Sequence, residues 1–364
     1  MVKGGSASKA AKGKTVKSGT GGKRQATASE QTPVARDSSP VALTVQQQCL
    51  NTFRDALQPD EQDSQTVQEV KGHLYGRNFA TAFGKQHYLQ VYASRWSPSR
   101  ALAYLQVLDD IAESLTSSHG ATGSDAAQKP WEVVCLGGGA GAELVAFAAW
   151  WSQQPDAGRT PHENIIVKLL DIASWDAVVG HLYDRIVTLP ELSKYASATA
   201  KETNKAMLRP EALSMSFTQQ DLLNWPVADI ARTVGSAELV TLMFTLNELY
   251  STNLPATQRL LSCLTTYMQK DSYLLVVDSP GSYSTVSING AEKKYPMQWL
   301  LDYTLLSSEP QAGKIEDKTK WEKVLSEASR WFRLPQQGLR YPIELENMRY
   351  QIHLYRRLRD TRDG

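Results

Sequence analysis

The sequence is poor in cysteine: its 364 residues include only Cys49, Cys135 and Cys263, which are far apart and form no CxxC pair. We therefore expect neither a disulfide framework nor a zinc site. We do expect a reducing compartment inside the cell. No run reaches the roughly 18 consecutive apolar residues of a membrane helix, and the first residues contain no apolar signal core. The six histidines are scattered and the full GxxxxGK[ST] pattern is missing, so we expect neither a metal site nor a P-loop.

An excess of charge of one sign is also missing, because 39 Lys and Arg balance 38 Asp and Glu. The distribution is uneven, however. Residues 1–40 consist mainly of Gly, Ser, Ala, Thr and Lys, and seven basic residues precede the first acid, Glu30. Such a segment buries too little apolar surface to fold, so we predict a disordered basic tail. It is either a nuclear or nucleolar address, an arm for nucleic acid, or a solubilising tail.

Residues 41–125 predict a helical N-terminal extension. Ser97 or Ser99 is expected to cap a helix with Pro98 in its first turn, because leucines then recur at helical spacing. Residues 73–96 interleave aromatic and basic side chains. That pattern suits base stacking and phosphate contact, and it is equally explained by core packing at helical spacing.

After an expected linker at residues 117–130, strands and helices alternate, which predicts an α/β fold for residues 126–364. Residues 188–212 are polar and resemble an insertion. The predicted strands are Trp131–Leu136, Ile165–Asp171, Ser214–Gln219, Leu239–Thr245, Tyr273–Asp278, Trp331–Leu334 and Met348–Tyr355, with helices at Ala142–Trp150 and Trp321–Ser329. We expect a doubly wound, Rossmann-like sheet whose last two strands, joined only by a loop, pair antiparallel.

The stretch VVCLGGGAGAELVAF ends a strand in glycines and restarts as a helix. Glycines let a ligand lie against bare backbone, and the next helix offers its N-terminus. Gly137, Gly139 and Ala142 satisfy the dinucleotide pattern GxGxxA, whereas Gly137, Gly139 and Gly141 satisfy the GxGxG of S-adenosylmethionine (SAM) enzymes. Gly138 completes the candidate cofactor loop.

Features beyond the glycines favour SAM. Asp171 ends the second strand, where a carboxylate accepts both ribose hydroxyls, or else it caps a turn. Asp221, with Gln220 beside it, follows the third strand and either accepts from the adenine amino group or caps a helix. Ile172 and Thr245, at two strand tips, complete the predicted cofactor set. The late strand–loop–strand ending is that of a methyltransferase and not of a dehydrogenase.

Five stretches carry a resemblance: YASRWSPSRALAYLQVL, WEVVCLGGGAGAELVAF, LLDIASW, TLMFTLNELY and ENMRYQIHLYRR. Through them the chain resembles class I methyltransferases and, more narrowly, the fungal 25S rRNA uridine-N3 methyltransferases. The resemblance implies a seven-stranded, mostly parallel sheet with an antiparallel last strand, SAM as methyl donor, and N3 of a uridine in large-subunit rRNA as acceptor. One position departs, since Cys135 stands where most class I enzymes carry an acid.

The tip of the fourth strand, TLNELY, is the expected catalytic position, because chemistry in open α/β sheets occurs beyond the carboxyl ends of the strands. Uridine N3 must lose its imide proton, which requires a base. Glu248 is the first candidate and Asp278, at the fifth strand's tip, the second. Tyr250 is expected to stack on the flipped base and Asn247 to bond a uracil carbonyl. Alternatively, Glu248 caps a helix and Tyr250 packs beneath it.

The C-terminal segment supplies a candidate RNA surface of arginines and aromatics, which a solvated strand face with ordinary ion pairs explains as well. Its arginines are Arg330, Arg333, Arg340, Arg349, Arg356, Arg357 and Arg359. We expect a monomeric RNA methyltransferase of the nucleus or nucleolus, and also of the cytoplasm, acting on rRNA or a pre-ribosome. The alternatives are a non-catalytic ribosome-assembly factor, a methyltransferase for proteins or small molecules, and an NAD(P)-dependent oxidoreductase.

Overall fold

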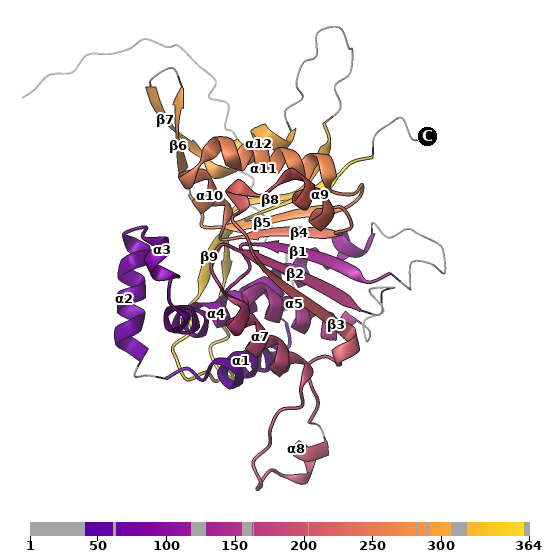
Figure 1. Cartoon of the computed structure of the whole chain (residues 1–364). Helices are drawn as coiled ribbons and strands as arrows, with labels where there is room; N and C mark the ends of the chain where they lie inside the picture. Colours follow the sequence, from indigo (N-terminus) through magenta and orange to yellow (C-terminus); the bar gives the residue numbers. More distant parts are fainter. Residues whose placement is uncertain are drawn as a thin grey trace, which may run out of the picture. The chain divides into compact units, whose positions relative to one another are not determined.

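A seven-stranded sheet, in the order β3-β2-β1-β4-β5-β9-β8, organises the chain (Figure 1). Its strands are β1 Trp131–Leu136, β2 Ile165–Asp171, β3 Leu213–Gln219, β4 Leu239–Met243, β5 Tyr273–Asp278, β8 Trp321–Phe332 and β9 Met348–Arg357. The first five strands run parallel, and β9 pairs antiparallel with both β5 and β8. The predicted α/β class, mostly parallel with an antiparallel last strand, is confirmed. A two-stranded hairpin, β6 Tyr283–Ile288 and β7 Ala291–Pro296, was not predicted.

The computed structural model describes residues 41–60, 63–117, 129–154, 162, 164–202, 204–281, 283–288, 291–306 and 319–359. The predicted basic tail of residues 1–40 and nearly all of the linker predicted at 117–130 lie outside these residues. Pro40–Gly364 group as one unit, so the N-terminal helices and the sheet are treated together.

Helices cover both faces of the sheet, with α1, α4, α5 and α7 on one and α9–α12 on the other (Figure 1). Their bounds are α1 Leu43–Leu57, α2 Ser64–Tyr75, α3 Phe79–Ala82, α4 Gln86–Ser117, α5 Ala142–Ser152, α7 Asp176–Val187, α8 Ala198–Glu202, α9 Val227–Val234, α10 Leu246–Thr252, α11 Leu254–Tyr267 and α12 Met297–Leu306. Alternate residues of the central strands therefore face two different cores: Val133 and Cys135 face the α5 side, whereas Val134 and Leu136 face the α11 side.

The predicted helix start at Ser97 or Ser99 is wrong, because α4 runs unbroken through Pro98. A proline inside a helix leaves the carbonyl four residues earlier without its N–H partner. Here that carbonyl belongs to Ser94, and the Tyr341 hydroxyl donates to it at 2.9 Å. Ser97 instead donates to the Ala140 carbonyl in the glycine loop at 2.7 Å, so α4 holds the loop from outside.

The helix predicted at Trp321–Ser329 and the separate strand at Trp331–Leu334 are also wrong, because one long edge strand, β8, replaces them. Its pairing with β9 shifts register twice, between Lys323 and Leu325 and between Glu327 and Arg330. Each irregularity breaks the alternation of inward and outward side chains, which hides the strand period from sequence inspection.

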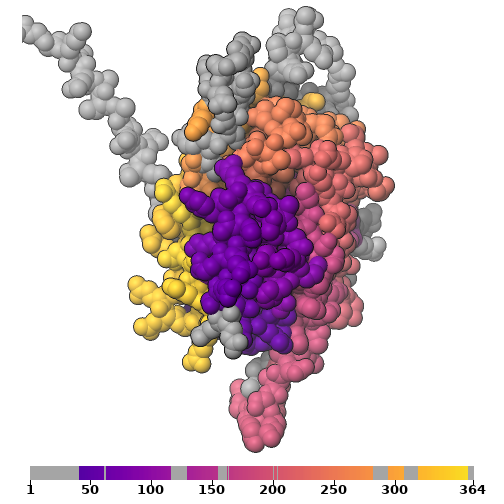
Figure 2. All heavy atoms as spheres, turned by 60° about the vertical axis from the view of Figure 1, so that its left-hand side comes forward, coloured from indigo at the N-terminus to yellow at the C-terminus, as the bar shows by residue number. Residues whose placement is uncertain are grey.

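The C-terminal segment packs beside the N-terminal helices, as Figure 2 shows for the yellow and indigo surfaces. Arg95 of α4 donates to the Glu344 carbonyl and pairs with the Glu346 carboxylate. Several aromatic residues of the 73–96 stretch pack against one another, since the Phe83 and Trp96 rings both contact the Tyr92 ring. Core packing therefore accounts for much of that pattern.

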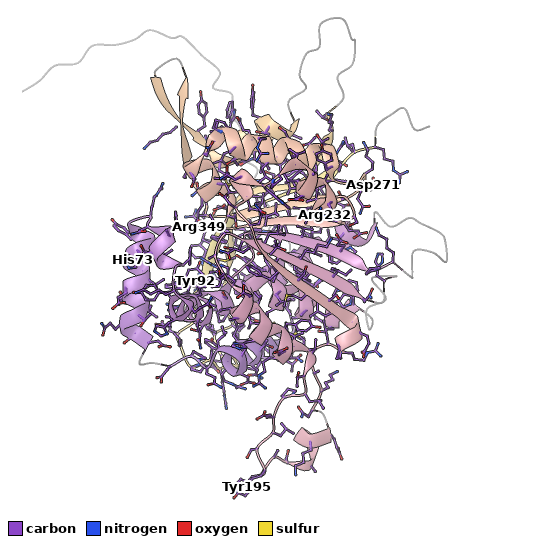
Figure 3. All side chains as sticks on the ribbon, viewed as in Figure 1. His73, Tyr92, Tyr195, Arg232, Asp271 and Arg349 are labelled. Atoms are coloured by element: carbon purple, nitrogen blue, oxygen red, sulfur yellow. The ribbon has the colours of Figure 1, made fainter. Side chains whose placement is uncertain are left out.

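Residues 188–212 contain α8 and a 3-10 turn at Pro210–Ala212, and their loop reaches away from the sheet in Figure 1. Tyr195 lies near the end of this excursion in Figure 3, where its side chain is exposed. Among the residues described, no helix is both long and apolar enough to cross a bilayer.

Candidate active site

The glycine loop fits tightly between side chains of the protein itself. Gly137 has a φ of +84° and Gly141 one of +78°, conformations that favour glycine. A Cβ atom on Gly137 would lie 2.1 Å from the Thr245 hydroxyl oxygen, and one on Gly139 would lie 2.0 Å from the Trp175 ring. The predicted strand–loop–helix turn is present, but at Gly137 and Gly139 the protein's own side chains fill the space that a Cβ would take.

Replacing Gly139 by alanine is expected to destabilise the protein by about 1–3 kcal/mol, the usual cost of overpacking. The buried Trp175 ring cannot yield easily, because Phe83 and Tyr92 pack against it. Gly180→Ala is the matched control, since nothing lies within 4 Å of its Cβ position inside α7. Alanine should stabilise that helix by about 0.5–1 kcal/mol. Urea unfolding of the wild type and of both variants checks the prediction. Equal unfolding midpoints for the three proteins would contradict it.

Asp171 connects the tip of β2 to the loop. Its carboxylate accepts from the backbone N–H of Gly139 and of Ala173, each at 3.1 Å. Burial raises the pKa of Asp171, and these two bonds oppose the shift by favouring the charged form. Asp171 therefore caps the turn after β2, which is the second of its two predicted roles, and its contact with a ribose stays a prediction.

Ile172, the next residue, is 61 % exposed and lines a cavity of about 460 Å³. The opposite wall comes from Phe79 and Phe83, in and just after α3, and Gln219 at the tip of β3 adds a polar edge. Lys85, Gln86 and Ser174 add further polar groups, and a mainly apolar cavity with a few polar groups suits a flat heteroaromatic group. The sequence did not single out Phe79 and Phe83, because nothing local links α3 to β2.

Asp221 caps the short turn Leu222–Asn224, which is the second of its two predicted roles. One carboxylate oxygen accepts from the Leu223 N–H at 2.9 Å and the other from the Asn224 amide at 2.7 Å. Gln220 joins the tips of β3 and β2 by donating its backbone N–H to the Asp171 carbonyl at 2.7 Å. Contact of Gln220 and Asp221 with adenine stays a prediction.

Glu143 supplies a buried acid directly beneath the loop. It is only 3 % exposed, and the hydroxyl of Thr241 and the thiol of Cys135 both donate to its carboxylate. A Cβ on Gly138 would lie 2.8 Å from this carboxylate. Burial raises the pKa of Glu143 to about 7. The carboxylate that is absent at Cys135 is thus supplied by Glu143 of α5. The sequence alone did not single out Glu143, although it lies in the stretch VVCLGGGAGAELVAF.

The tip of β4 is strained and tightly held. Phe244 has a φ of +58°, unusual for a bulky residue, and such strain is characteristic of functional sites. Thr245 follows as the N-cap of α10, with its side chain against Gly137. Asp278 accepts from the backbone N–H of Asn247 at 3.0 Å and of Ser279 at 2.7 Å. The tips of β4 and β5 are therefore joined, as the topology predicts.

Glu248 has the environment of a base. Its surface reaches solvent, and among the described residues its carboxylate has no hydrogen-bond partner. Desolvation by surrounding protein atoms, reinforced by the charge of Asp278, raises its pKa to about 7, and Arg100 opposes the shift. Asp278 itself is buried, and its pKa is raised to about 6. The two predicted acids therefore do lie close together.

Arg100, from α4, is the cation of this acidic cluster, and the sequence did not identify it. It donates to the Tyr92 hydroxyl at 2.6 Å, and its guanidinium lies 5.2 Å from the centre of the Phe244 ring. It is also within electrostatic reach of Glu248 and Asp278. Arginine stays charged at any ordinary pH, so it lowers the cost of a carboxylate here.

Tyr250 does not join the cluster. It is only 2 % exposed and belongs to the core under α10, α11 and α12. In this conformation it offers no face to a base, and the packing role is the one observed. The side-chain oxygen of Asn247 is buried without a hydrogen-bond partner among the described residues, and so is the hydroxyl of Tyr250. A buried, unpaired acceptor is costly and is characteristic of a ligand contact.

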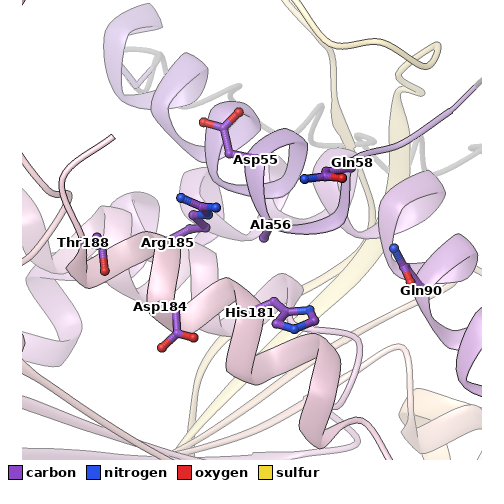
Figure 4. Close-up of a pocket in the computed structure, with 8 residues that line it drawn as sticks. All are labelled: Asp55, Ala56, Gln58, Gln90, His181, Asp184, Arg185 and Thr188. Atoms are coloured by element: carbon purple, nitrogen blue, oxygen red, sulfur yellow. The ribbon is translucent and has the colours of Figure 1, made fainter. Parts of the chain in front are cut away.

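A second cavity, of about 370 Å³, lies between α1 and α7 (Figure 4). Asp55, His181, Asp184 and Arg185 line it, and none of them belongs to the strand tips. Across the described ranges, no three His, Cys, Asp or Glu side chains are grouped so that they could hold a metal ion.

The comparison with protein families decides the identity. A family model of SAM-dependent methyltransferases matches residues 50–356. The chain belongs to this family. The methyltransferase is also 31 % identical, over 84 % of its length and 82 % of the relative's, to the 25S rRNA (uridine(2843)-N(3))-methyltransferase of Saccharomyces cerevisiae. The predicted cofactor class and enzyme class are therefore confirmed.

Two solved structures are also similar to the methyltransferase. A SAM-dependent methyltransferase from Methanosarcina mazei aligns with a TM-score of 0.36 and 8 % identity, over 65 % of this chain and 96 % of that one. The SAM-bound amino pentose methyltransferase CalS10 from Micromonospora echinaspora gives 0.32 and 11 %, over 70 % and 91 %.

The site's groups fit the cofactor that the family uses. Asp171 offers a carboxylate at the tip of β2, and Ile172 offers an apolar surface beside the cavity at α3. The unpaired oxygen of Asn247 is an acceptor suited to an amino group. Contact between these residues and the cofactor stays a prediction.

Proposed function

We propose that this methyltransferase transfers a methyl group to N3 of a uridine in large-subunit rRNA. The observation that carries the proposal is the similarity to the yeast enzyme, which extends over most of both chains. An acidic cluster with a base of raised pKa, at the position where this fold performs its chemistry, supports it. Such a substrate also agrees with the predicted nuclear or nucleolar location and with a pre-ribosome as partner.

The chemistry begins with a proton. The N3–H of uracil must be removed before or during transfer, because the nitrogen lone pair is otherwise delocalised into the two carbonyls. Glu248, with a pKa of about 7, is ionised in part at neutral pH and accepts that proton. Arg100 stabilises the negative charge that passes between the base and Glu248. Bound SAM supplies the electrophilic methyl group.

Positioning contributes as much as acid–base chemistry. Asp278 fixes the start of α10 through the Asn247 N–H, so Glu248 and Asn247 are held by the same anchor. A donor and an acceptor held in one site react as if in one molecule, which accounts for a large part of many enzymatic rates. The target base must leave its stack, at a cost of about a few kcal/mol that is lowest in an unpaired loop.

Nucleoside analysis tests the function. The purified protein is incubated with SAM and large-subunit rRNA transcribed without modifications, and the digested RNA is examined by mass spectrometry. We expect 3-methyluridine at one position and none when SAM is left out. A methyl group on another atom or nucleotide would overturn the proposed acceptor. Binding of SAM without any RNA product would favour a protein or small-molecule substrate.

Cofactor binding is tested separately by calorimetric titration with SAM and with NADH. Asp171→Asn is expected to weaken SAM binding roughly 10- to 100-fold, because hydrogen bonds to a charged group contribute about 1.5–3 kcal/mol. Glu202→Gln, on the exposed α8, is the control for loss of a carboxylate and should bind normally. No binding of SAM by the wild type would favour the non-catalytic assembly factor, and binding of NADH alone would favour an oxidoreductase.

A further inference from the structure

Three exposed side chains form a surface that the proposed mechanism does not use. Trp331 of β8 is 51 % exposed, and the guanidinium groups of Arg333 and Arg349 lie 4.9 and 5.8 Å from the centre of its ring. Trp331 and Arg349 are direct partners in the pairing of β8 with β9, so their side chains leave the sheet on one face. These three residues are called the Trp331 patch below.

The C-terminal arginines divide into two groups in the structure. Arg330, Arg356 and Arg359 pair with carboxylates, and Arg357 donates to backbone carbonyls. Two acids of the same segments are also occupied, since Glu327 pairs with Arg330 and Glu346 with Arg95.

Arg333, Arg340 and Arg349 remain, and two of these, Arg333 and Arg349, lie beside the Trp331 ring. Among the described residues, neither lies within ion-pair distance of a carboxylate, and the side chain of Arg349 donates only to the Ser329 hydroxyl at 2.9 Å. Two such guanidinium groups beside an exposed indole present positive charge and an aromatic face together. This combination suits phosphate and an unpaired base.

The Trp331 patch lies at the active-site edge of the sheet. Asp278, at the tip of β5, pairs with Gln351 of β9, so Arg349 lies two residues beyond that tip. A cavity of about 230 Å³ connects this position with the catalytic cluster, because Arg349, Phe244 and Arg100 all line it. In Figure 3, Arg349 is labelled at this side of the sheet and Arg232 at α9, away from it.

We propose that the Trp331 patch binds an unpaired nucleotide of the RNA substrate next to the target uridine. A base stacks on Trp331, and Arg333 and Arg349 hold the phosphates on either side of it. The adjoining cavity then leads the strand toward Arg100 and Glu248. The inference rests on the proposed function, and it adds a second point of contact that selects single-stranded RNA.

Binding of a fluorescent, single-stranded uridine 12-mer to the full chain tests the Trp331 patch, measured by anisotropy at several salt concentrations. We expect Trp331→Ala to weaken binding by about tenfold and Trp331→Phe to restore most of it, because every aromatic ring offers a stacking face. Arg333→Ala combined with Arg349→Ala should lower the slope of log K against log salt by roughly 0.7 per lost phosphate contact.

Trp299→Ala and Arg232→Ala remove an exposed tryptophan and an exposed arginine elsewhere, and both should bind like the wild type. SAM titration of every variant confirms that the fold is intact.

If the wild type methylates rRNA while Trp331→Ala binds and reacts normally, the Trp331 patch is not an RNA site although the proposed function stands. If the wild type binds no RNA, both this inference and the proposed function are wrong. Equal competition by a polyglutamate peptide would assign the patch to a protein partner and overturn the inference.

Discussion

Replacing Glu248 by glutamine is expected to lower the rate of methyl transfer by about 10²–10⁴-fold, the usual contribution of a general base. Glutamine keeps the shape of the side chain but cannot accept the imide proton. The affinity for SAM should change much less than the rate, because glutamine retains the shape of the side chain. Single-turnover rates with a saturating RNA fragment, together with SAM titrations, measure the two quantities separately.

The pH dependence of the same reaction identifies the group. Glu248 acts only when ionised, and its pKa in the folded protein is about 7. The rate of the wild type should therefore rise from pH 5.5 to about 7.5 and level off above that, whereas Glu248→Gln should lose this rise. Arg100→Gln would remove a charge that lowers the pKa of Glu248, so the midpoint should move to higher pH.

Asp278→Asn is the comparison that separates the two candidate acids. Both oxygens of Asp278 already accept backbone N–H groups, so its loss should disturb the start of α10 and impair binding as well as rate. If Asp278→Asn instead abolished the pH-dependent rise and Glu248→Gln retained it, Asp278 would be the base and the assignment to Glu248 would be wrong.

The second large effect concerns stability. Glu143 is buried, and its pKa is raised from 4.5 to about 7 in the folded protein. Between these values the folded state binds more protons than the unfolded state, so the free energy of unfolding falls as the pH rises. At 1.36 kcal/mol per pKa unit, the loss between pH 4.5 and 8 is about 3 kcal/mol.

Glu143→Gln removes this titration. The difference in unfolding free energy between variant and wild type should shift by about 2–3 kcal/mol in favour of the variant from pH 5 to pH 8. Taking the difference cancels the other acids with raised pKa values, Glu248 and Asp278, which both proteins share. Urea unfolding at several pH values measures the shift, and parallel curves for the two proteins would contradict it.

Thr241→Val provides the companion variant. The Thr241 hydroxyl donates to the Glu143 carboxylate and lowers its pKa, so the isosteric valine should raise that pKa further and extend the loss of stability to higher pH. A valine variant with the pH dependence of the wild type would show that the hydroxyl does not stabilise the charged form.

Local patterns in the sequence were enough for much of the cofactor side. The turn from β1 to α5 needs glycine because of its backbone angles, and Asp171 ends a buried apolar run, so both could be recognised from neighbouring residues. The antiparallel ending followed from a loop too short for a crossover helix. These features depend on residues that are close in the chain.

The failures arose where distant residues compensate for a local violation. Pro98 stays inside α4 because Tyr341, far along the chain, satisfies the carbonyl that the proline leaves free. The two register shifts of β8 are stabilised by pairing with β9, although they destroy the alternation expected of a strand. Tyr250 was expected to stack on the flipped base, but its side chain packs in the core under α12.

By itself, the sequence determined the fold class, the glycine loop and the acids at the strand tips, because strand order and turn chemistry are encoded locally. Only the tertiary structure decided how these acids behave. Arg100 reaches Glu248 from α4, Glu143 replaces the acid absent at Cys135, and β8 brings Trp331 beside Arg349. Charge, burial and pKa depend on distances in space, and the folding of remote segments onto one sheet edge sets those distances.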